Sequence, residues 1–282
     1  MAYSPSPRPD YSGPTHIPYA DVTRHLWGDT EAGNVSDWIY VSTAKIHQLV
    51  FGLAPGGAFR HSEEFRTIFG ADLIYYVLSG RMVIANPQTG EVHQVAPGEA
   101  AFFRKDTWHH VFNYSAEPLR ILEYFAPPPS TGTSGAYARK QPYLADVRYQ
   151  NPAHVGQWPV EQRRVEQEFT IRVLRAADLL WTLKPGAPLP TPVGQFVSTE
   201  HLTAAKMELL PGQRTELESH SGDECLYVLD GTVNIFCPDA EGRQWFELSP
   251  RDGFFVPAGA QHAYHNISGT PATLIFGVAP TE

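Results

Sequence analysis

The chain has little cysteine and few charged residues, and both shortages limit its class. Cysteine accounts for 2 of the 282 residues, Cys225 and Cys237, on either side of an expected Asp-Gly turn at Asp230–Gly231. In a hairpin with that turn Cys237 would face away from Cys225, so we expect no disulfide. Charged residues make up 18% of the chain, no lysine or arginine run stands out, and the formal net charge is −9. These features argue against nucleic acid or an anionic membrane surface as a partner.

Long apolar runs are also lacking. No stretch approaches the length of a membrane span, and the first ten residues, MAYSPSPRPD, contain no apolar signal-peptide core. We therefore expect a cytoplasmic protein that does not bind a membrane. The 23 glycines and 25 prolines favour many short strands and turns over long helices, and a hydrophobic content of 42% is enough for a real core.

The sequence contains an internal repeat of two copies. Val41-Ser42-Thr43 recurs as Val197-Ser198-Thr199, Tyr76–Gly80 resembles Tyr227–Gly231, and His109 with Asn113 recurs as His262 with Asn266. An offset of roughly 150 residues is too long for a solenoid and indicates a duplicated domain. Within each copy, short apolar runs end at Gly, Pro or Asn, which predicts an antiparallel all-β unit of about eight strands. We place an N-terminal arm at 1–20, the first domain at 21–127, a linker at 128–160 and the second domain at 161–282.

Four side chains of the second copy have the spacing of metal ligands. Glu218 and His220 are two residues apart, so an extended segment presents both on one face. Glu224 opens the next apolar run, which we expect to form a hairpin at Asp230–Gly231, and His262 follows a Pro/Gly bend. Two imidazoles and up to two carboxylates can hold a divalent transition metal and leave positions open for substrate.

The alternative to a metal is a polar barrel interior without one. Burying two carboxylates without a compensating cation costs several kcal/mol or forces them to protonate, so the pattern favours a metal. Glu218 has two candidate roles, as a fourth ligand or as a catalytic general base.

These residues fit the motifs of a known family. The two copies resemble cupin domains, and the chain resembles a bicupin. The first cupin motif falls, with every spacing met, on Gly212, Glu218, His220, Glu224 and Gly231. The second falls on Arg251, Pro257, Gly259, His262 and Asn266. Glutamate replaces the first histidine, and arginine replaces the leading glycine of the second motif. The resemblance implies two tandem jelly-roll barrels (double-stranded β-helices), and cupins commonly pair, so it also implies a homodimer.

The first copy departs further from the motifs. Leu73 occupies the position of Glu224 and cannot bind a metal. A second candidate site would consist of His61, Glu63 and His109, provided that a β-bulge shifts the register by one residue. Without that shift their neighbours face inward instead and no site forms.

For function, the resemblance implies a metal-dependent enzyme acting on a small molecule. We favour a non-haem dioxygenase with Fe²⁺ acting on a carbonyl or aromatic metabolite, because apolar residues such as Leu226 and Val228 are expected to line the pocket. Arg214 shares a strand face with Glu218 and is a candidate for binding a substrate carboxylate.

Two other classes stay open. One is a Lewis-acid hydrolase, isomerase or decarboxylase with Mn²⁺, Ni²⁺ or Zn²⁺. Glutamate at the first ligand position is similar to ureidoglycine aminohydrolases, manganese bicupins that differ from this chain at the positions of Glu224 and His262. The other is a binding or sensing cupin without catalysis.

Overall fold

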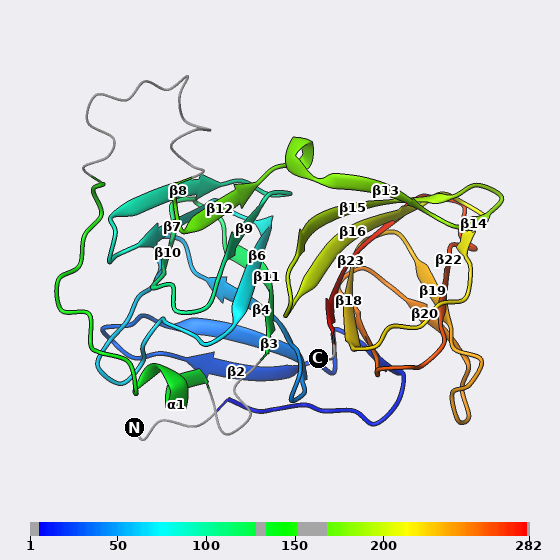
Figure 1. The fold of residues 1–282 in the computed structure, drawn as a ribbon, viewed down its shortest axis with the longest axis horizontal. Coiled ribbons are helices and arrows are strands. Elements are labelled where there is room, and N and C mark those ends of the chain that lie inside the picture. The colour runs from blue at the N-terminus through cyan, green and yellow to red at the C-terminus, as the bar shows by residue number, and fades with distance from the viewer. Residues whose placement is uncertain (1–5, 128–133, 152–167, 281–282) are drawn as a thin grey trace. The chain divides into compact units, whose positions relative to one another are not determined.

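The structure is a computed structural model, and it describes residues 6–127, 134–151 and 168–280. The chain divides into two compact units. The first holds mainly Arg24–Trp38 and Leu49–Ala177, and the second holds Arg8–Thr23, Ile39–Gln48 and Asp178–Glu282. Each unit is a β-barrel built from two sheets (Figure 1). The prediction of an all-β protein with two jelly-roll barrels is confirmed.

The first barrel consists of a seven-stranded sheet in the order β12-β9-β6-β11-β4-β3-β2 and a four-stranded sheet in the order β5-β10-β7-β8. Its strands are β2 (Thr23–Trp27), β3 (Val35–Ser42), β4 (His47–Leu53), β5 (Ala58–Phe59), β6 (Asp72–Ser79), β7 (Met82–Asn86), β8 (Glu91–Val95), β9 (Ala100–Phe103), β10 (His110–Asn113), β11 (Leu119–Ala126) and β12 (Ile171–Leu174). A short helix, α1 (Ser134–Ala138), follows β11.

The second barrel has a seven-stranded sheet in the order β1-β21-β18-β23-β16-β15-β13 and a five-stranded sheet in the order β14-β17-β22-β19-β20. Its strands are β1 (Thr15–Ile17), β13 (Leu180–Lys184), β14 (Gly186–Ala187), β15 (Thr191–Ser198), β16 (Thr203–Leu209), β17 (Arg214–Thr215), β18 (Asp223–Asp230), β19 (Val233–Phe236), β20 (Trp245–Leu248), β21 (Gly253–Val256), β22 (Ala263–His265) and β23 (Ala272–Ala279). A 3₁₀ turn, Ala176–Asp178, precedes β13. No helix among the described residues is long and apolar enough to cross a membrane.

Apolar side chains on the inward face of the strands fill the second barrel. Leu226 and Val228 of β18 share an inward face and are fully buried with Phe254 of β21 and Leu274 of β23 in one apolar cluster. Residues on one face of a strand alternate with those on the other, so this apolar face fixes the register of β18. Glu224 has the same parity and therefore also points into the barrel.

The expected hairpin at Asp230–Gly231 is wrong. β18 pairs with β21 and β23, whereas β19 pairs with β20 and β22, so the Asp-Gly turn carries the chain from one sheet to the other. Gly231 is needed there because its φ is +72° and an added Cβ would lie 2.4 Å from the carbonyl oxygen of Pro271. Cys225 and Cys237 are both buried free thiols.

The N-terminal arm is part of a sheet. β1 pairs antiparallel with β21, with Ile17 opposite Gly253. Upstream, the Arg8 guanidinium donates a hydrogen bond to the Thr43 carbonyl at 2.9 Å. The arm therefore adds an edge strand to the seven-stranded sheet of the second unit.

The predicted linker, 128–160, lies partly outside the described residues. Its described part packs on the first unit, because His61 hydrogen-bonds the carbonyl of Leu144 at 2.9 Å and contacts the Tyr143 ring. β12, which falls in the range predicted for the second domain, pairs with β9 of the first barrel. Ile171 and Val173 of this strand are buried and alternate with the partly exposed Arg172 and Leu174.

Candidate metal centre

Four side chains of the second barrel converge near one end of β18. They are Glu218, His220, Glu224 and His262, and together we call them the ligand group. Glu218 and His220 lie in the segment between β17 and β18, Glu224 is the second residue of β18, and His262 lies in the turn from β21 to β22.

Backbone hydrogen bonds fix the segments that carry these side chains. Glu218 and His262 form an isolated antiparallel bridge, in which each N–H donates to the other residue's carbonyl at 2.9 Å. The carbonyl of His220 accepts a hydrogen bond from the N–H of Gly259 at 2.8 Å. The two imidazoles are therefore held by rigid contacts between the loop before β18 and the Pro/Gly bend after β21.

Gly222 allows the loop between His220 and Glu224 to pass close to β23. An added Cβ would lie 1.5 Å from the carbonyl oxygen of Ala279, a distance at which the backbone must move. We therefore expect Gly222→Ala to lower the free energy of unfolding by about 1–3 kcal/mol and to weaken metal binding by displacing His220. Thermal unfolding and elemental analysis measure both effects. Gly269→Ala is the matched control, since nothing lies within 4 Å of its added Cβ, and equal behaviour of the two variants would contradict the prediction.

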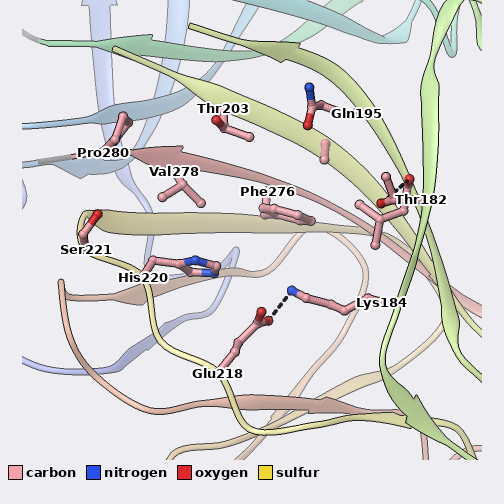
Figure 2. Close-up of a pocket in the computed structure, with 12 residues that line it drawn as sticks. Thr182, Lys184, Gln195, Thr203, Glu218, His220, Ser221, Phe276, Val278 and Pro280 are labelled. Carbon is pink, nitrogen blue, oxygen red and sulfur yellow. Dashed lines mark hydrogen bonds and ion pairs between the residues drawn. The ribbon is translucent and has the colours of Figure 1, made fainter. Parts of the chain in front are cut away.

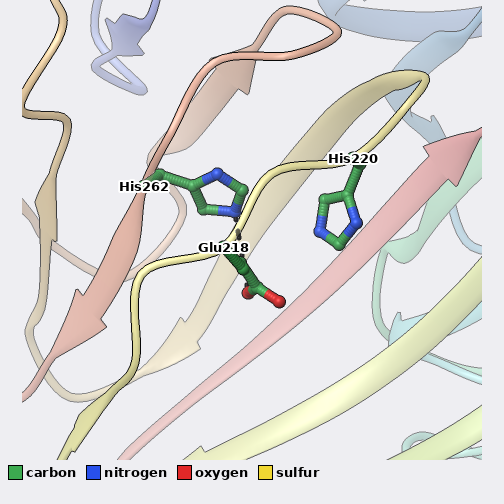
Figure 3. Close-up of side chains that lie close together, drawn as sticks. All are labelled: Glu218, His220 and His262. Carbon is green, nitrogen blue, oxygen red and sulfur yellow. Dashed lines mark ion pairs between the residues drawn. The ribbon is translucent and has the colours of Figure 1, made fainter.

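The donor atoms of the ligand group lie close together. One ligand atom each of Glu218, His220 and His262 falls within 4.8 Å of the others, the one such group of histidine, cysteine and acidic residues found among the described residues (Figure 3). Glu224 Oε2 lies 2.9 Å from His220 Nε2 and 3.2 Å from His262 Nε2, and Glu218 Oε1 lies 3.7 Å from His262 Nε2. The structure thus brings all four predicted residues to one point.

Three of these potential metal-ligand atoms make no polar contact with described residues outside the ligand group, as expected for atoms that bind a cation. His220 Nε2, Glu224 Oε2 and His262 Nε2 are buried, and none makes a hydrogen bond of normal geometry within the described structure. Leaving buried polar atoms without partners is costly, so several such atoms at one point indicate a site built for something else. Imidazole nitrogen and carboxylate oxygen are both ligands of divalent first-row metals, so the residues present fit such an ion.

Neighbouring groups keep Glu224 ionised and oriented. Burial by itself would raise the pKa of Glu224, but His262 and His220 hold this pKa well below its ordinary value. Burial acts to lower the pKa of His262, and Glu224 more than reverses this, so the pKa of His262 is raised. The Tyr264 hydroxyl donates a hydrogen bond to Glu224 Oε1, which leaves Oε2 facing the two histidines. Such outer hydrogen bonds fix the orientation of a ligand.

Glu218 and His220 form one wall of a pocket of about 440 Å³. Figure 2 shows Lys184 reaching from β13 towards Glu218, with which its ammonium forms a close ion pair. Gln195 and Thr203 lie across the same pocket, and Phe276 contributes an apolar surface. His262 and Glu224 are almost completely buried beneath, with relative exposures of 0% and 1%. The pocket therefore opens onto the more exposed half of the ligand group.

The residues that we expected to bind substrate lie elsewhere. Leu226 and Val228 face inward but are enclosed in the apolar cluster of the core, with no exposed surface, and are not among the residues that line this pocket. Arg214 is exposed on β17, opposite His265, and lines a separate hollow of about 520 Å³. Arg214 does not share a face with Glu218 because β17 ends at Thr215. The alternation of side chains along a strand therefore does not continue from Arg214 to Glu218.

The three residues of the second candidate site are not brought together by any contact that the described structure shows. His109 is fully buried in the first barrel, where its Nε2 lies 3.0 Å from the Tyr75 hydroxyl and burial lowers the pKa of His109 to about 4. His61 instead bonds His110 through Nδ1 at 2.7 Å, and Glu63 is exposed. His110, which we had not placed in any site, thus belongs to a buried histidine pair.

Lys184 was missed by the sequence reasoning. It lies 34 residues before Glu218, in a strand preceding the cupin motifs, and no spacing rule connects the two.

The fold and the ligand group define the class: a protein of two tandem jelly-roll barrels, of which the second carries a candidate metal site. The cupin domain model matches residues 50–125 and 205–278, so the chain belongs to the cupin family. No curated protein sequence matches the chain.

Several solved structures share the fold at low sequence identity. A mutant of Bacillus subtilis oxalate decarboxylase superposes with a TM-score of 0.64 at 14% identity, covering 98% of this chain and 79% of that one. A putative glyoxylate-induced protein from Pseudomonas aeruginosa gives 0.66 at 16%, covering 99% and 93%. Protein Ylba from E. coli gives 0.62 at 13%, covering 95% and 90%. Another structure of the B. subtilis decarboxylase is described by its Mn(II) centres.

Proposed function

We propose that the second barrel binds one divalent transition metal through the ligand group and catalyses a non-oxidative reaction of a small oxygenated metabolite. When bound, such an ion acts as a Lewis acid that polarises a carbonyl or carboxyl oxygen of the substrate. The observation that carries the proposal is the convergence of three buried ligand atoms, on His220, Glu224 and His262. Their polar contacts in the described structure are ion pairs within the ligand group, and none makes a hydrogen bond of normal geometry.

The composition of the pocket favours a non-oxidative reaction. The oxidative interpretation depended on apolar pocket walls, and the residues chosen for it, Leu226 and Val228, lie in the core. The pocket that is present combines the charged and polar side chains of Lys184, Gln195 and Thr203 with apolar residues such as Phe276. Its few polar groups lie beside the ligand group, where they suit an oxygen-bearing molecule that can form hydrogen bonds with them. The oxalate decarboxylase among the similar structures is described with manganese, and a mixed carboxylate and imidazole ligand set is compatible with Mn²⁺ as well as Fe²⁺.

Each residue of the ligand group has a separate task in this proposal. His262 and Glu224, fully buried, hold the ion, and His220 completes the inner wall. Glu218 is partly exposed to the pocket, with a relative side-chain exposure of 21%, and its Oε1 is paired with Lys184. We assign this oxygen the exchange of a proton with bound substrate, because it is the acidic atom of the ligand group that faces both the pocket and a neighbouring cation.

Elemental analysis and oxygen consumption test the proposal. Purified protein should contain about one divalent ion per chain, and the Mn²⁺ form should turn over a small oxygenated metabolite without consuming O₂. Protein loaded with Fe²⁺ under anaerobic conditions and then exposed to air should show no substrate-dependent O₂ uptake with diketones or catechols.

Three outcomes would redirect the assignment. Sustained O₂ uptake with product formation would establish the dioxygenase instead. Thermal stabilisation by a ligand without turnover would establish a sensing protein. Failure to take up any metal would remove the proposal.

The homodimer and the cytoplasmic location stay predictions. Sedimentation of the purified chain tests the first, and fractionation of cells that express it tests the second.

A further inference from the structure

Lys184 brings a positive charge into the pocket beside the ligand group. Its side chain is largely buried, with a relative exposure of 20%, and its ammonium pairs with Glu218 Oε1. The same ammonium lies 5.8 Å from the ring centre of Tyr264 and 5.7 Å from that of Phe276. Aromatic faces attract cations, so these contacts hold the ammonium in place over the pocket.

The ammonium of Lys184 has N–H donors that make no hydrogen bond within the described structure. A lysine carries three N–H donors, and Glu218 is the one hydrogen-bond acceptor for them within the described part of the chain. Gln195, on β15, faces the same pocket, and its side-chain amide makes no hydrogen bond among the described residues. Two donor groups that are both without further partners thus face one cavity (Figure 2).

The charges of the metal-bound site favour an anion. The two carboxylates of Glu218 and Glu224 balance a divalent ion when both histidines are neutral, which leaves the charge of Lys184 uncompensated. The site then carries one net positive charge, which is costly where it is partly buried, and a ligand carboxylate would compensate it through a charge-assisted hydrogen bond. A neutral substrate of the same shape would not compensate this positive charge.

We propose that the substrate is a small carboxylic acid whose carboxylate binds the Lys184 ammonium and the Gln195 amide, while an oxygen next to that carboxylate faces the ligand group. This inference rests on the proposed function and narrows it to one substrate class. Lys184 is the specificity-determining residue of the site. The pocket of about 440 Å³ has ample room for such an acid.

Lactate and its neutral amide, lactamide, test the inference, because they differ in charge and hardly in shape. Isothermal titration of the Mn²⁺-loaded full-length chain should give at least about tenfold tighter binding of lactate than of lactamide. Lys184→Met, which keeps the length of the side chain but not its charge, should weaken lactate binding by about tenfold or more and leave lactamide binding unchanged. Lys184→Arg should restore most of the preference for lactate.

Lys206→Met is the matched control. This lysine lies on β16, pairs with Glu208 at 2.7 Å and is not among the residues that line the pocket, so its loss should leave both affinities as in wild type. Manganese is counted in the same samples. If the wild-type chain takes up no Mn²⁺, the proposed function fails and this inference fails with it. If Mn²⁺ binds but lactate and lactamide bind equally, or Lys184→Met weakens both alike, the inference alone is overturned.

Discussion

His262→Ala should reduce the metal content of the purified protein from about one ion per chain to nearly none. His262 is fully buried, its Nε2 lies 3.2 Å from Glu224 Oε2, and its backbone is bridged to Glu218, so no other side chain can move into its place. Elemental analysis after dialysis against a weak chelator measures the loss.

The chain supplies its own control for this experiment. His109 occupies the corresponding place in the first barrel, is equally buried, and bonds Tyr75 rather than a carboxylate. His109→Ala should therefore keep one ion per folded chain, as should His61→Ala. If His109→Ala or His61→Ala empties the protein as His262→Ala does, the metal lies in the first barrel and our assignment of the centre fails.

The two-barrel fold could be predicted because cupin motifs mark positions where the backbone conformation is restricted to a few residue types. Gly231 must have a positive φ, and Pro257 with Gly259 forces the bend before His262. Such positions keep their spacing even when the side chains between them change. The ligand group could be predicted for the same reason, since each of its members lies at a fixed sequence separation from one of these turns.

Contacts between distant segments could not be read in this way. An Asp-Gly pair indicates a tight turn but does not say whether the next strand returns to its neighbour or crosses to another sheet. The turn at Asp230–Gly231 crosses, so the expected hairpin was wrong. Strand parity placed Leu226 and Val228 on the inner face correctly, but parity does not separate the packed core of a barrel from its open pocket.

The first barrel contains two buried acids that no motif indicated. Asp37 on β3 and Glu123 on β11 have relative exposures of 7% and 6%, and neither carboxyl group has a hydrogen bond or ion pair with any described residue. Burial raises the pKa of Asp37 to about 8. Burial, together with the negative charge of Asp37, raises the pKa of Glu123 well above its ordinary value. The barrel therefore favours the protonated, uncharged form of both acids.

Asp37→Asn should make the protein more stable in alkaline solution and leave it unchanged in acid. Because the folded state holds the Asp37 proton more tightly than the unfolded state, the contribution of Asp37 to wild-type stability is greatest below about pH 4, falls as the pH rises towards about 8, and is constant above. Asparagine resembles the protonated acid and cannot ionise. Near pH 9 the variant should therefore exceed wild type by about 3–5 kcal/mol in the free energy of unfolding, and near pH 4 the two should agree.

Urea unfolding followed by circular dichroism across this pH range measures the difference. Asp239→Asn, at an exposed position, removes the same charge without relieving any burial, so its curve should follow that of wild type. Equal stability of Asp37→Asn and wild type near pH 9 would mean that a cation compensates the Asp37 carboxylate in the folded protein. The first barrel would then bind a positively charged group of its own, rather than serve as an uncharged scaffold beside the metal-binding barrel.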